Sequence, residues 1–149
     1  MPADPWIFVD DVNAFVSSGG RFCYYVVTHE AANPAGIDAS SASNIACTAQ
    51  QDLIYIPNCV ILGSGIAENA TFKPIMGFVD VQEYQFLIIN RWGQVIWETT
   101  DPDDAWDGRI GSQGIQVQIG VYAYYVAVRS GTTKRVEKRG TVTVLTAQE

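Results

Sequence analysis

Groups that commonly perform catalysis are scarce in this sequence, which has one histidine, His29, and only 17% charged residues. A catalytic triad needs a base that deprotonates a neighbouring nucleophile. His29 stands at the end of an apolar run, just before a turn-like stretch, so we interpret it as a surface turn residue. No glycine-rich loop opens a helix-like segment, so nothing supports a phosphate site. We therefore expect no enzyme and no cofactor.

Long hydrophobic runs and clustered positive charge are also missing. No apolar stretch approaches the roughly 18 residues that a membrane helix needs, so we expect no transmembrane segment. The net charge is −7, which gives no basic footprint for nucleic acid or anionic lipid. Residues 1–5 lack the positive start and apolar centre of a signal peptide, and we expect the chain to be a fragment of a longer protein.

Cysteine is limited to three residues, two of which have a suggestive spacing. Cys23 and Cys47 lie in two apolar runs, and the midpoint between them, Ala35, falls in the turn signal at 33–36. Opposed residues of an antiparallel hairpin are within disulfide reach, so we expect a Cys23–Cys47 bridge, with two buried free thiols as the alternative. A disulfide indicates the periplasm or the outside of the cell.

The third cysteine and the acidic residues are the remaining candidates for metal ligands. Cys59 is expected to be a buried, inert apolar residue, with an intermolecular bridge as the alternative. The sequence has no C-x-x-C pair, so we expect no zinc. The acidic run 101–108 could hold calcium, but it lacks the length and distal Glu of an EF-hand. We interpret it as a turn whose Asp side chains accept backbone hydrogen bonds.

What the sequence does contain is a series of short apolar or alternating runs separated by turn signals. The pattern predicts an all-β fold, an immunoglobulin-like antiparallel β-sandwich of about seven strands with an extra N-terminal segment of two or three strands. The polar stretch 49–52 divides the chain into predicted domains 1–52 and 53–149. The predicted strands are 6–9, 22–28, 43–48, 53–57, 71–74, 83–90, 95–99, 121–129 and 136–145.

Several short motifs follow one another in a set order between residues 53 and 146. They are I-P-N at 56–58, T-F-K-P at 71–74, N-R-W-G-Q at 90–94, W-D-G at 106–108, G-V-Y-A-Y at 120–124 and K-R-G-T-V-T at 138–143. Together they resemble the gliding-motility-associated C-terminal domain of Bacteroidetes, the type B sorting signal of the type IX secretion system. The motif residues to which we assign structural roles are Pro57, Asn58, Asn90, Arg91, Trp92, Gly93, Trp106, Asp107 and Gly108.

The resemblance has a departure and an N-terminal extension. In relatives, the sequence that starts at this proline usually reads P-N-A-F-x-P-N-G-D-G-x-N-D. The corresponding residues 57–69 here lack the Asp-rich turn and are more apolar. We expect this loop to pack, or to present a sticky surface. Residues 4–50 resemble the closing half of a fibronectin-III-like domain, with a similar cysteine pair.

The resemblance implies a signal that carries an attached cargo through the periplasm to the cell surface or the medium. The implied partners are the cargo and an outer-membrane translocon or shuttle protein. A basic cluster near the end of an acidic chain could steer it to an acidic receptor, although a solvated strand edge is the alternative. The expected recognition residues are Gly120, Val121, Tyr122, Lys134, Arg135, Lys138, Arg139 and Gly140.

A second reading is a structural or adhesive sandwich. Trp92 and Trp106 stand beside turns and could stack on glycans, whereas Trp97 lies in a strand and is expected in the core. A half fibronectin-like segment would leave strand edges open, and another copy could complete them or form a bridge through Cys59.

Overall fold

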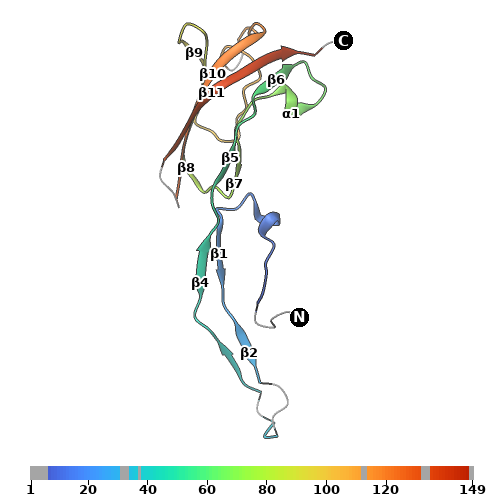
Figure 1. Ribbon diagram of the computed structural model, residues 1–149, viewed down its shortest axis with the longest axis vertical. Helices are drawn as coiled ribbons and strands as arrows, with labels where there is room; N and C mark the ends of the chain where they lie inside the picture. Colours follow the sequence, from blue (N-terminus) through green and yellow to red (C-terminus); the bar gives the residue numbers. More distant parts are fainter. Residues whose placement is uncertain (1–6, 31–33, 37, 112–113, 132–134, 148–149) are drawn as a thin grey trace.

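The computed structural model describes residues 7–30, 34–36, 38–111, 114–131 and 135–147. A β-sandwich occupies one end of an elongated molecule, and a long two-stranded arm extends from it (Figure 1). The described elements are strands except for two helical pieces of one turn each. The predicted all-β sandwich is therefore confirmed.

The main layer of the sandwich is a five-stranded sheet in the order β6-β11-β10-β8-β9. Neighbours pair antiparallel, except that β6 runs parallel to β11. The sequence predicts an antiparallel sheet and a loop at these residues, and both predictions are wrong for this strand. Its pairing partner lies about 80 residues later in the chain, so no local turn signal reveals it. The bounds are β6 Cys59–Leu62, β8 Val81–Ile89, β9 Val95–Thr99, β10 Gly120–Ser130 and β11 Val136–Thr146.

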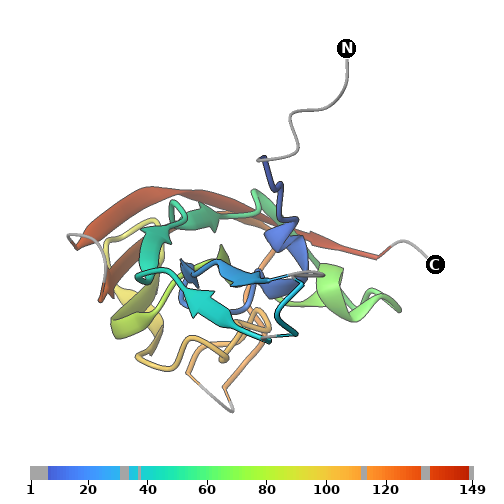
Figure 2. The same ribbon diagram turned by 90° about the horizontal axis from the view of Figure 1, so that it is seen from below.

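A smaller layer covers the inner face of this sheet. It contains the two-stranded sheet of β5 (Leu53–Tyr55) and β7 (Ile75–Gly77), the single helical turn α1 (Ala67–Ala70) and the backbone bridge between Phe72 and Trp106. Figure 2, which looks along the arm, shows β10 and β11 on one side of the molecule and the short segments on the other. The core between the layers contains Val60, Leu62, Phe72, Tyr84, Phe86, Ile88, Trp97, Trp106, Val126, Val128, Val142 and Val144.

The arm is a β-ribbon held by a disulfide. Cys23 and Cys47 face each other in register and are bonded, as the turn signal midway between them predicts. The predicted strand 22–28 is interrupted, because the side chain of Ser43 accepts a hydrogen bond from the backbone N–H of Val26. Residues 7–9 are extended but unpaired, so the strand predicted at 6–9 was wrong for its described part. The arm elements are the 3-10 turn η1 Val12–Phe15, β1 Arg21–Tyr24, β2 Val27–His29, β3 Ser40–Ala42 and β4 Ala46–Ala49.

The junction between arm and sandwich is small. The ring of Phe22 packs edge-on against Phe78, with centroids 6.3 Å apart. The backbone N–H of Phe78 donates to the carbonyl of Val16 at 2.7 Å. Phe78 adopts a φ of 58°, which is rare for a bulky residue, and a Cβ on Gly20 would clash with it. Phe78 therefore provides both a ring contact and a backbone hydrogen bond where the arm meets the sandwich.

Candidate recognition surface

The N-R-W-G-Q motif forms the turn between β8 and β9. The side-chain oxygen of Asn90 accepts backbone hydrogen bonds from Trp92 and Gln94, each at 3.0 Å, and its amide donates to the Gln94 side chain at 2.9 Å. Gly93 has a φ of 81°, as the predicted hairpin turn requires. This turn leaves the Trp92 indole 75% exposed, with the Arg91 guanidinium over its ring at 5.3 Å.

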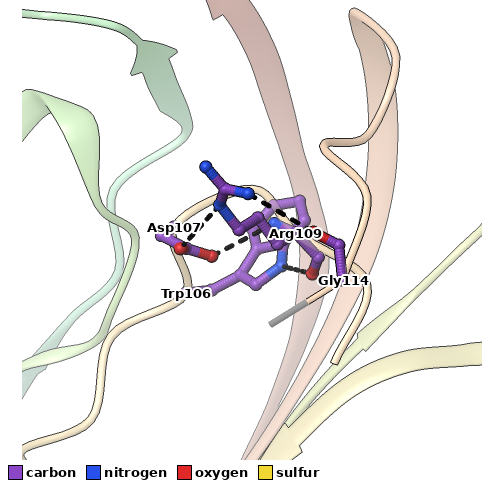
Figure 3. Close-up of polar contacts among 4 residues, drawn as sticks. All are labelled: Trp106, Asp107, Arg109 and Gly114. Atoms are coloured by element: carbon purple, nitrogen blue, oxygen red, sulfur yellow. Dashed lines mark hydrogen bonds and ion pairs between the residues drawn. The ribbon is translucent and has the colours of Figure 1, made fainter. Parts of the chain in front are cut away.

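The W-D-G motif anchors a second loop, which lies beside this turn. Figure 3 shows the polar contacts that hold it. Trp106 is fully buried, and its Nε1 donates to the carbonyl of Arg109 at 2.8 Å. Asp107 accepts from the Arg109 backbone at 3.2 Å and pairs with its side chain at 3.3 Å. Arg109 also donates to the carbonyl of Gly114 at 3.4 Å. The motif thus shapes the loop, and Trp106 is not available for stacking on a glycan.

Two of the motifs and the loop that follows the W-D-G motif meet around one groove of about 340 Å³. The turn after β8, the loop that follows Gly108 and the start of β10 all contribute to it. The sequence did not predict that the exposed apolar residues of this loop, Ile110 and Ile115, would line a groove. The one signal that could have identified them is that they are apolar residues in a loop rich in glycine and glutamine. We call this the distal groove, and its lining includes Arg91, Trp92, Ile110, Ile115, Gln116 and Tyr122.

The start of β10 divides its side chains between the two faces of the sheet. Tyr122 points inward, packs against Trp106 with ring centroids 5.7 Å apart, and donates its hydroxyl to the carbonyl of Gln118 at 2.9 Å. Val121 lies on the other face and is 58% exposed. Gly120 begins the strand opposite Val144. Only Val121 of these three predicted recognition residues therefore offers a side chain on the outer face.

Part of the basic cluster gathers around Tyr125 on that outer face. The Arg139 guanidinium lies over the Tyr125 ring at 5.3 Å, and Arg135 donates to the Tyr125 hydroxyl at 3.3 Å. Glu137 stands between the two arginines, 3.2 Å from one and 3.6 Å from the other. The hydrogen bond to Tyr125 raises the pKa of Arg135 above the usual value of an arginine side chain. The cluster is therefore an organised cationic and aromatic surface, and we call it the Tyr125 cluster.

The remaining predicted residues of the basic end strand have packing partners. Lys138 donates to the carbonyl of Ile54 at 2.7 Å, which ties β11 to β5. Gly140 lies opposite Tyr124, and a Cβ at that position would lie 2.5 Å from the Tyr124 hydroxyl. Both residues therefore have a structural use, and their recognition role stays a prediction. Lys134 lies outside the described residues.

The remaining motif residues and the third cysteine lie at or just before the start of β6. The carbonyl of Asn58, which follows Pro57, accepts from the backbone of Thr143 at 2.9 Å and extends the pairing with β11. Cys59 is exposed, so the expected burial was wrong. The alternation of β6 explains this, because its neighbour Val60 takes the inward position.

The acidic loop and His29 take the places expected of turn residues. Asp101 accepts from the backbone of Asp103 at 2.9 Å, and Asp104 accepts from the hydroxyl of Thr99 at 2.8 Å. Within the described part of the chain, no group of three or more acidic, histidine or cysteine side chains is arranged to hold a metal ion. His29 is exposed at the end of β2. No described helix is both long and apolar enough to cross a membrane.

Fold and motifs together define a small β-sandwich module that presents ordered loops at one end and a basic face near the other. The family model of the CHU_C type IX secretion signal domain matches residues 55–144. The chain therefore belongs to the type IX secretion signal domain family, as its motifs predict. This family is not an enzyme family, and membership implies export to the cell surface or the medium.

Comparisons with individual proteins add little. No curated protein matches the chain. Among solved structures, the chain is similar to the crystal structure of CopC from Methylosinus trichosporium OB3b, at 16% identity and a TM-score of 0.42. That likeness covers 64% of this chain and 89% of the other. We attach no functional meaning to it.

Proposed function

We propose that the sandwich directs an attached cargo protein across the outer membrane by docking on the type IX secretion machinery after export to the periplasm. The observation that carries the proposal is the family match at 55–144, which coincides with the folded sandwich. Recognition is a surface event in which this domain forms and breaks no covalent bond. The motif residues support it indirectly, since they hold the turns that give the surface its shape.

The Tyr125 cluster is the part of the surface that we propose the machinery reads. Arg135 and Arg139 are exposed guanidinium groups on a chain whose net charge is −7, so they stand out against an acidic background. Arginine held over an aromatic ring is well suited to pairing with carboxylates. Exposed Val121 lies on the same face of β10, since it is four residues from Tyr125 along the strand. An acidic receptor patch would match this face.

We propose that the arm and the sandwich are two domains, 1–52 and 53–149, with the arm lying between cargo and signal. The buried hydrophobic residues of the described chain all lie from Val60 to Val144. The arm contributes none of them and joins the sandwich mainly through Phe78. Such a small junction supports a signal that folds independently of what precedes it.

The test fuses the chain to a periplasmic reporter in a bacterium that has a type IX secretion system. The double variant Arg135→Glu/Arg139→Glu should lower export by about tenfold, because it reverses the charge that steers docking. The matched control is Arg21→Glu, an exposed arginine on the arm. Unchanged export by the double variant, with a normal melting temperature, would remove the Tyr125 cluster from the proposal.

A further inference from the structure

The distal groove has a frame that is fixed before any ligand arrives. Ile96, Val117 and Tyr122 are half-buried and pack against the hydrophobic core. The neighbouring loop is tied to β9, because the backbone N–H of Gly111 donates to the carbonyl of Ile96 at 2.8 Å. The described lining comes from residues 90–122, so the groove is built by the sandwich alone. A site that is already ordered loses little conformational freedom when it binds a ligand.

An exposed aromatic ring and free amide groups border this groove. The Trp92 indole is 75% exposed, and the hydrogen bonds of Asn90 hold its turn in place. Gln116 and Gln118 are exposed, and their side-chain amides have no hydrogen-bond partner in the part of the chain that the structure describes. Each of these amides offers N–H donors and an acceptor oxygen. The groove therefore suits a ligand that has both an apolar surface and hydrogen-bonding groups.

Saccharides combine these two properties. The C–H groups on the face of a sugar ring pack against an indole, and the hydroxyl groups at its rim exchange hydrogen bonds with amides. A lipid or another purely apolar ligand would leave the Gln116 and Gln118 amides unpaired in a desolvated groove, which costs free energy. The volume of about 340 Å³ is at the lower end of the roughly 300–1,000 Å³ of small-ligand sites, so the groove suits a short stretch of a saccharide chain.

Charge in the groove favours a saccharide that carries carboxylates. The Arg91 guanidinium lies over the Trp92 ring at 5.3 Å and pairs with no carboxylate among the described residues. The described lining contains this arginine and no Asp or Glu, although the whole chain has a net charge of −7. A guanidinium is a planar fork of N–H donors that matches the two oxygens of a carboxylate. A carboxylate on the sugar would therefore meet a cation in the groove without facing an anion.

We propose that the distal groove is a binding site for a uronic-acid saccharide. A sugar ring packs on the exposed part of Trp92, its hydroxyl groups bond to Gln116 and Gln118, and its carboxylate pairs with Arg91. This activity goes beyond export, because it gives the exported module a ligand outside the cell. The site shares no residue with the Tyr125 cluster, so saccharide binding and sorting can be tested separately and either can fail without the other.

The test titrates oligogalacturonate and oligoalginate into the full chain and measures the heat of binding by calorimetry. We expect saturable binding of at least one of these oligomers, with a dissociation constant below about 1 mM. Trp92→Ala should weaken that binding by about tenfold, because an exposed tryptophan carries much of the binding energy of its site. Arg91→Gln should lower the affinity for the charged oligomer to that for its methyl ester.

Two matched controls lie outside the groove. Tyr55→Ala removes an exposed aromatic ring on β5, and Arg139→Gln removes an exposed arginine of the Tyr125 cluster. Both should leave the affinity unchanged. Trp92→Phe, which keeps an aromatic ring in the groove, should bind within about threefold of the parent chain. Circular dichroism and the melting temperature of each variant check that the sandwich remains folded.

Three results would overturn the proposal. Failure of both oligomers to bind at about 1 mM would leave the groove to a protein partner or to none. Binding that survives Trp92→Ala, or that falls equally with Arg139→Gln, would place the saccharide on another surface. Equal affinities of the parent chain for the charged oligomer and its methyl ester would remove the role of Arg91 and the choice of an acidic saccharide.

Discussion

At the scale of single residues, most motif positions support the shape of the domain. Asn90 satisfies the backbone of its turn, Trp106 fills the core while bonding to Arg109, and Gly140 leaves room for Tyr124. These roles explain why a signal domain can carry recognisable motifs whose side chains are turned away from solvent. Motif side chains that remain exposed include Trp92, Val121 and Arg139.

Gly140→Val should destabilise the sandwich by about 1–3 kcal/mol, because the added atoms overpack the Tyr124 ring. Chemical unfolding followed by tryptophan fluorescence measures the change. The matched control is Gly65→Ala, where a Cβ meets nothing within 4 Å. We expect that control to change stability by less than about 0.5 kcal/mol. Equal effects at the two glycines would contradict the packing role of Gly140.

Tyr84 gives the folded chain a sensitivity to alkaline pH. Its side chain is 6% exposed, and its hydroxyl has no hydrogen-bond partner among the described residues. Burial first, and then the charges of Asp101 and Asp104, raise the pKa of Tyr84 above its usual 10.0. The unfolded chain therefore releases this proton at lower pH than the folded chain. The stabilising effect of the neutral phenol is complete below pH 10 and is lost as the pH rises towards the folded-state pKa.

Tyr84→Phe should consequently be close to neutral at pH 7, since it removes an unpaired buried group. Its free energy of unfolding should also fall less between pH 9 and pH 11 than that of the parent chain. Urea unfolding at a series of pH values measures both. Tyr55→Phe, at an exposed tyrosine, should retain the pH dependence of the parent. Parallel curves for the parent and Tyr84→Phe would contradict the assignment.

At the scale of secondary structure, local patterns predicted some elements well and others poorly. Strand β9 occupies the predicted 95–99, and β10 and β11 are each within one residue of their predicted ends, because alternation and flanking turns mark them. The β6 strand and the β7 strand were missed. Each is only three or four residues long and pairs with a strand distant in sequence, and such pairing leaves no local signal.

Only part of the candidate site could be predicted, because contacts between residues distant in sequence leave no local signal. Sequence spacing identified Arg135 and Arg139, but it could not show that Tyr125 and Glu137 organise them, since that contact depends on the register between β10 and β11. The distal groove could not be predicted either, because its three segments meet only in the fold.

Removing the disulfide tests the arm as an element. The double variant Cys23→Ser/Cys47→Ser should lower the stability of the ribbon by about 3 kcal/mol, given the 24-residue separation of the two cysteines. Hydrogen exchange should become faster in β1–β4, while β8, β10 and β11 keep their protection. Loss of protection in both regions together would show that arm and sandwich unfold as one unit.

At the scale of the whole molecule, the chain combines two parts with different demands. The sandwich buries a hydrophobic core, whereas the arm exposes its apolar side chains and contains a disulfide. The family membership belongs to the sandwich alone, because the match begins at residue 55. This division agrees with a portable signal that is attached to a structurally distinct segment.

Residues 53–149 should fold without the arm. We expect a melting temperature within about 5 °C of the full chain, because the arm supplies few contacts to the core. Thermal unfolding of the two chains, followed by circular dichroism, makes the comparison. An unfolded 53–149 fragment would contradict the proposed domain boundary.

Export of a reporter tests the central claim most directly. The reporter is fused ahead of residues 53–149 and produced in a bacterium with a type IX secretion system and in a strain lacking the outer-membrane translocon. We predict reporter on the cell surface or in the medium of the first strain and retained in the periplasm of the second. Reporter that stays in the periplasm of both strains, or is exported from both, would contradict the claim that this sandwich is a sorting signal for that machinery.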